Sequence, residues 1–80
     1  MRKTIYTPQH RSIAVRLRRA RQSARLTQVE AARKLRKPQS YVSRCESGDH
    51  RLDVIELQTF AWMYKKSLDY FTAPLKKPKP

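Results

Sequence analysis

The stretch that decides the fold runs from Lys37 to Gly48 and reads KPQSYVSRCESG. On a helix, with about 100° between successive residues, its side chains divide into two arcs. One arc holds only hydrogen-bonding side chains, and these are Gln39, Ser40, Ser43, Arg44 and Ser47. The other arc holds Pro38, Tyr41, Val42, Cys45 and Glu46. Because Gly48 suits the left-handed end of a helix, the pattern predicts a short amphipathic helix over 39–47 with a wide polar side.

Helix signals continue on both sides of this stretch. Thr27 and Glu30 have the spacing of a capping box, and so do Asp53 and Glu56. Together with Thr7-Pro8, which is typical of a helix start, these signals predict five helices joined by short turns. The expected helices cover residues 8–24, 27–35, 39–47, 53–64 and 68–71. The fold class is therefore all-α, a compact bundle of about five helices.

The apolar residues of these helices define the expected core. They are Ile13, Leu17, Ala20, Ala24, Ala31, Ala32, Leu35, Val54, Leu57, Phe60, Ala61, Tyr64, Leu68 and Phe71. Cys45 is expected to join them as a small core residue rather than as a nucleophile.

Composition restricts the partners. The 80 residues make one domain, and 19 Lys and Arg against 6 acidic residues give a net charge of +13. A charge this large favours polyanionic partners, above all nucleic acid, with anionic membrane as the competitor. No apolar run approaches the roughly 18 residues of a spanning helix. The single cysteine cannot form an internal disulfide, which suits a reducing cytoplasm.

An enzyme is excluded by the inventory of chemical groups. Five of the six acidic residues fit helix N-termini or a salt bridge, and only Asp49 is left, beside His50. With His10 as the one other histidine, no catalytic dyad, metal set or cofactor site is expected. His50 is most simply a loop residue near the backbone of a bound nucleic acid.

Three segments then carry a family resemblance: LTQVEAARKL (26–35), QSYVSRCESG (39–48) and LDVIELQTFAWMYKKSLDYF (52–71). In this order they resemble the Cro/phage-repressor type (xenobiotic-response-element type) of helix-turn-helix transcriptional regulator, over roughly Ile13 to Phe71. The resemblance implies a lambda-repressor-like DNA-binding domain over 9–71, with the helix-turn-helix proper at about 27–47. Residues 1–8 form an N-terminal arm and 72–80 a basic Lys/Pro tail that we expect to be disordered.

The sequence departs from the family pattern at three positions. Arg36-Lys37 and Lys65-Lys66 stand where glycine and an apolar residue are usual, and Pro38 replaces a polar cap. A non-glycine residue in the left-handed conformation costs about 1 kcal/mol. We therefore expect the turn at Arg36-Lys37 to be wound differently.

The resemblance also implies roles for individual residues, since it makes 39–47 the recognition helix of the major groove. Base reading falls to Gln39, whose amide can pair with adenine, to Ser40, and to Arg44, which can take guanine or a phosphate. The expected contacts to the DNA backbone are Gln28, Ser43, Ser47, Arg51 and Tyr41. Gln28 is also expected to brace Gln39. A plain exposed hydroxyl is the alternative for each serine, and packing is the alternative for Tyr41.

Two further pairs have expected structural roles. Arg21 and Glu46 are implied to form a partly buried ion pair that ties the first helix to the third. Ile55 and Trp62 lie together on the side of the fourth helix opposite its core face. They are a candidate seam for a homodimer on a palindromic operator, or for a protein partner such as a toxin. Alternatively, the Ile5-Tyr6 arm or the tail covers them.

The sequence thus favours a sequence-specific regulator of transcription that binds double-stranded DNA, acting as a repressor in the cytoplasm on the nucleoid. The alternative is an antitoxin, or another partner-binding module, that also binds its own promoter. A basic RNA or membrane-surface binder would leave the short second helix and the glycine cap unexplained.

Overall fold

The computed structural model describes residues 8–72, and within them all regular structure is helical. The five helices are α1 (Pro8–Ser23), α2 (Gln28–Leu35), α3 (Gln39–Ser47), α4 (Val54–Tyr64) and α5 (Leu68–Thr72). The expected all-α bundle of five helices is confirmed. The helix start at Thr7, the Ile5-Tyr6 arm and the tail beyond Thr72 lie outside the described residues.

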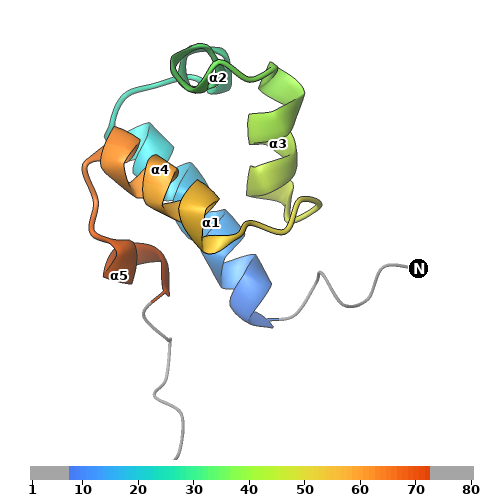
Figure 1. Ribbon diagram of the computed structural model, residues 1–80, viewed down its shortest axis with the longest axis vertical. Coiled ribbons are helices and arrows are strands. Elements are labelled where there is room, and N and C mark those ends of the chain that lie inside the picture. Colours follow the sequence, from blue (N-terminus) through green and yellow to red (C-terminus); the bar gives the residue numbers. More distant parts are fainter. Residues whose placement is uncertain (1–7, 73–80) are drawn as a thin grey trace, which may run out of the picture.

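α1 and α4 lie at the centre of the bundle, and α2, α3 and α5 are arranged around them (Figure 1). α1 packs against α3, α4 and α5, while α2 packs against α3. In Figure 1, α2 lies at the top, α3 at the right and α5 at the lower left. α3 therefore packs mainly against α1 and α2, and the side chains on its outer side are exposed.

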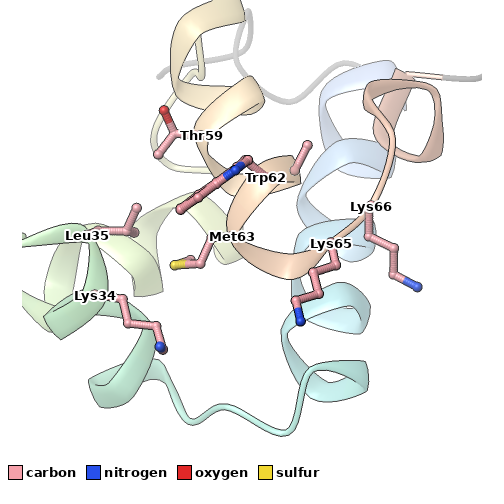
Figure 2. A pocket seen from close by; sticks show the side chains of 8 residues that line it. Lys34, Leu35, Thr59, Trp62, Met63, Lys65 and Lys66 are labelled. Atoms are coloured by element: carbon pink, nitrogen blue, oxygen red, sulfur yellow. The ribbon is translucent and has the colours of Figure 1, made fainter.

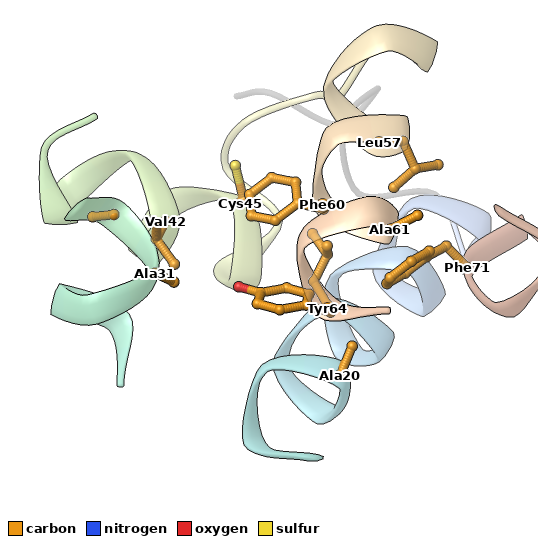
Figure 3. Close-up of a cluster of buried hydrophobic side chains, with 11 residues drawn as sticks. Ala20, Ala31, Val42, Cys45, Leu57, Phe60, Ala61, Tyr64 and Phe71 are labelled. Carbon is orange, nitrogen blue, oxygen red and sulfur yellow. The ribbon is translucent and has the colours of Figure 1, made fainter. Parts of the chain in front are cut away.

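The core lies between α1, α2, α3 and α4, with α5 closing one end (Figure 3). Its largest fully buried side chains are Phe60, Phe71, Leu17, Val42 and Cys45. Five alanines are also buried, and their small side chains allow the helices to approach closely; they are Ala14, Ala20, Ala31, Ala32 and Ala61. Most of the core is thus made of the expected residues.

One expected core residue is wrong: Val54 is 63% exposed. It occupies the first position of α4, where Asp53 and Ile55 beside it are exposed as well. Leu52, from the preceding loop, packs against the core instead.

Local signals set the helix ends. Both expected capping boxes are present, Thr27 with Glu30 and Asp53 with Glu56. At the C-terminal ends, four residues adopt the left-handed conformation, and they are Arg25, Arg36, Gly48 and Lys65.

The turn between α2 and α3 is an ordinary helix end in spite of its sequence. Arg36 takes φ 59°, and the Lys37 N–H donates to the carbonyl of Ala32 at 3.0 Å. The expectation of a differently wound turn is therefore wrong. The hydrogen bonds of the turn hold Arg36 in the left-handed conformation, although the close approach of its Cβ to the backbone costs about 1 kcal/mol.

Candidate nucleic-acid interface

The outer side of α3 carries the polar arc. Gln39, Ser40, Arg44 and Ser47 are exposed and Ser43 is half-buried, whereas Val42 and Cys45 are buried against the core. Pro38 supplies no side-chain acceptor to the first-turn amides of α3. This end of the helix therefore keeps N–H donors and a partial positive charge that suit an anion such as a DNA phosphate.

The side chain of the first residue of α3 is held by a hydrogen bond that it donates to α2. Nε2 of Gln39 donates to Oε1 of Gln28 at 3.0 Å, and Nε2 of Gln28 donates in turn to Oε1 of Glu46 at 3.1 Å. The Gln39 amide still has its oxygen and a second N–H to offer. These two groups form the bidentate pair that can recognise adenine. The structure thus brings Gln28 and Gln39 together at the open end of α3.

The chain of hydrogen bonds ends at Arg21 on α1. Arg21 donates to Glu46 from Nε at 2.7 Å and from Nη2 at 3.2 Å, and from Nη1 to the Leu26 carbonyl at 2.8 Å. The two side chains are only 11% and 5% exposed. The hydrogen bond to Glu46 raises the pKa of Arg21, although burial acts in the opposite direction. Through Glu46 and Gln28, this ion pair joins α1, α2 and α3. The position of the Gln39 side chain therefore depends on how these three helices pack.

A second polar cluster, which the sequence did not reveal, holds the other side of α3. The Tyr41 hydroxyl donates to Oε2 of Glu56 at 2.9 Å, and Nε2 of His50 lies 3.0 Å from the same oxygen. The Tyr41 ring stacks on Phe60, with 6.2 Å between ring centroids. The one available signal was the place of Tyr41 at the edge of the buried arc. Tyr41 therefore packs between helices, and its expected phosphate contact stays a prediction.

Burial and hydrogen bonding in this cluster shift two pKa values. Burial, followed by the bond to Glu56, raises the pKa of Tyr41 well above its ordinary range. For Glu56, burial acts to raise the pKa, but bonds from the Asp53 backbone, His50 and Tyr41 outweigh it and lower the pKa. The Glu56 carboxylate is thus a fixed anchor between α3, the following loop and α4.

The far end of α3 is tied to α1. Nε2 of His10 lies 2.9 Å from the carbonyl oxygen of Gly48, a contact that the sequence did not indicate. The Ser47 hydroxyl donates to the Arg44 carbonyl at 3.2 Å and so keeps only its lone pairs for a further partner. Arg51, in the loop beyond Gly48, is exposed. Both ends of α3 are therefore anchored while its polar face remains open.

Few of the described residues could bind a metal ion or act as a nucleophile. Within residues 8–72, no three His, Cys, Asp or Glu residues lie close enough together to hold a metal ion. Burial raises the pKa of the Cys45 thiol to about 12, which keeps it protonated and unreactive. None of the described helices is both long and apolar enough to cross a lipid bilayer.

Two short helices, α2 and α3, are joined by a tight turn, and the second of them carries an exposed polar face. This arrangement defines a helix-turn-helix, a class of DNA-binding module. The sequence matches the family model described as a helix-turn-helix domain over residues 12–64, which runs from α1 to the end of α4. The chain belongs to this helix-turn-helix family, which is consistent with the Cro/phage-repressor resemblance. No curated protein matches the chain.

Proposed function

We propose that the protein is a sequence-specific regulator of transcription that binds double-stranded DNA and reads the major groove with α3. Repression is the role we favour. The observation that carries this proposal is the exposed, acid-free polar face of α3, whose first residue is braced by Gln28. A braced amide loses less conformational freedom on binding than a free one, which is an advantage for reading a base.

Each residue of the interface then has a task. Gln39, Ser40 and Arg44 read bases, and Gln28, Ser43, Ser47, Arg51 and Tyr41 contact the backbone. The net charge of +13 supplies the long-range attraction to phosphate. In this role the protein acts on nucleoid DNA in the cytoplasm.

The second part of the proposal concerns the number of copies on the operator. Helix-turn-helix proteins of this type bind two half-sites about one DNA turn apart as dimers. Ile55 and Trp62, 68% and 82% exposed on α4, are the candidate seam. The same exposed pair supports the alternative function, an antitoxin that holds a protein partner and binds its own promoter.

Footprinting on the DNA upstream of the protein's own gene tests the function. We expect protection of a palindromic site and an affinity that falls steeply as salt rises, because phosphate binding releases counterions. Arg51→Ala should flatten this salt dependence by about one charge. Arg19→Ala, an exposed arginine on α1, is the control and should leave the slope unchanged. An identical slope for both variants and the parent would remove Arg51 from the interface, and uniform weak protection would contradict sequence specificity.

A further inference from the structure

A groove separates the last turns of α2 and α4. α2 packs against α3, and α4 packs against α1 and α5, so the C-terminal ends of these two helices leave an open space between them. Its volume of ≈ 830 Å³ is in the range of sites that hold a bulky side chain or a short peptide segment. Figure 2 shows Leu35, Met63 and Trp62 gathered between the two helices.

The chemistry of the groove is apolar inside and positive at the edge. Leu35 and Met63 are half-buried and pack against the core, and beside them Trp62 is 82% exposed. Lys34, at the end of α2, and Lys65, just beyond α4, are exposed at the edge. None of the six acidic residues of the sequence lines the groove. An exposed tryptophan beside aliphatic side chains is typical of a binding hot spot.

This surface is distinct from the interface with DNA. The groove is lined by the ends of α2 and α4, and none of the proposed DNA contacts lines it. A phosphate backbone would find the lysines there but would leave the apolar floor unused. The groove therefore calls for an occupant that has both an apolar side chain and negative charge.

We propose that the groove binds an acidic amphipathic segment of a partner protein, with an apolar side chain against Trp62, Leu35 and Met63 and carboxylates on the lysines. A second copy of the chain fits less well, because a protein of net charge +13 brings like charge to a lysine-edged groove. This inference chooses between the two occupants considered for the Trp62 seam and assigns it to a partner protein, so that a homodimer on the operator would have to pair through another surface. It does not depend on DNA binding.

Trp62 is the chain's single tryptophan, so its fluorescence reports directly on the groove. The full-length protein is titrated with a synthetic amphipathic helical peptide that has leucine and phenylalanine on one face and glutamate beside it. The matched peptide has lysine in place of glutamate. We expect the glutamate peptide to shift Trp62 emission to the blue and to protect it from acrylamide, and the lysine peptide to do neither. Failure of the glutamate peptide to shift the emission, or equal shifts with both peptides, would overturn the proposal.

Variants separate the groove from general attraction between charges. The double variant Lys34→Glu, Lys65→Glu should bind the glutamate peptide at least about tenfold more weakly, as loss of close charge pairs requires. The control Arg18→Glu, Arg19→Glu makes the same change of net charge on exposed positions of α1 and should bind like the parent. Equal weakening in both double variants would overturn the proposal.

Two further measurements of Trp62 fluorescence show whether something other than an acidic partner occupies the groove. If Trp62 emission shifts to the blue with protein concentration alone, and sedimentation shows a dimer, the occupant is a second copy. If duplex DNA shifts it instead, the groove belongs to the DNA interface. Either result overturns the proposal, whereas a protein that binds the glutamate peptide but no operator would refute only the proposed function.

Discussion

Removal of either member of the Arg21–Glu46 pair should cost more stability than any surface substitution. The Arg21 side chain is only 11% exposed in the parent, and in Glu46→Ala its guanidinium would keep only its bond to the Leu26 carbonyl. An almost buried charge left without its counter-ion costs about 3–5 kcal/mol. An 80-residue domain at 0.05–0.15 kcal/mol per residue has a total stability of roughly 4–12 kcal/mol. A single substitution can therefore bring the protein close to unfolding.

The double variant Arg21→Met, Glu46→Leu is the decisive comparison. Because it removes both charges and fills the site with apolar atoms, we expect its stability to lie within about 1 kcal/mol of the parent or above it. Urea unfolding followed by helical circular dichroism measures all variants; Trp62, already 82% exposed, is a poor reporter of unfolding. Two single losses below about 1 kcal/mol that simply add in the double variant would show an ordinary surface ion pair and refute the reasoning.

Three other predictions concern stability. Arg36→Gly and Lys65→Gly should each stabilise the protein by about 1 kcal/mol, because both residues have φ 59°; Arg33→Gly, inside α2, should instead cost about 1 kcal/mol, and a loss at all three positions would contradict the left-handed turns. Tyr64→Phe should be neutral or stabilising by up to about 1 kcal/mol, since the buried Tyr64 hydroxyl has no hydrogen-bond partner; a clear loss of unfolding free energy would show that the hydroxyl is bonded. Because the pKa of Glu56 is lowered on folding, its contribution is fully present above the ordinary value of 4.5 and is lost as the pH falls through the lower folded value. In Glu56→Gln the urea midpoint should thus fall less steeply on acidification than in the parent, and equal steepness would contradict the shift.

Local signals in the sequence account for most of the fold. The capping boxes at Thr27 and Asp53 fix where α2 and α4 begin, because each depends on residues only three positions apart. Periodicity placed the buried and exposed sides of α3 correctly for the same reason. Val54 was wrongly predicted to be buried. The apolar periodicity of a helix shows which face points to the core but not how much of that face the neighbouring helices cover.

The contacts that cross the fold could not be derived in this way. Glu56 is a capping residue in its local sequence, yet its second oxygen receives Tyr41 from α3 and lies against His50. Likewise, the groove beside Trp62 exists only because α2 and α4 pack against other helices. The left-handed Arg36 shows that hydrogen bonds in a turn can outweigh an unfavourable residue preference.

The central claim is that Gln39, braced by Gln28, reads a base. The most direct measurement compares the affinity of the parent and Gln39→Ala for the footprinted operator and for random duplex DNA at one salt concentration. We expect a loss of about 1–3 kcal/mol on the operator, relaxed discrimination at one base pair, and almost no change on random DNA. Gln58→Ala, an exposed glutamine on α4, should match the parent on both DNAs. Equal losses on the two DNAs, or none on the operator, would contradict the account.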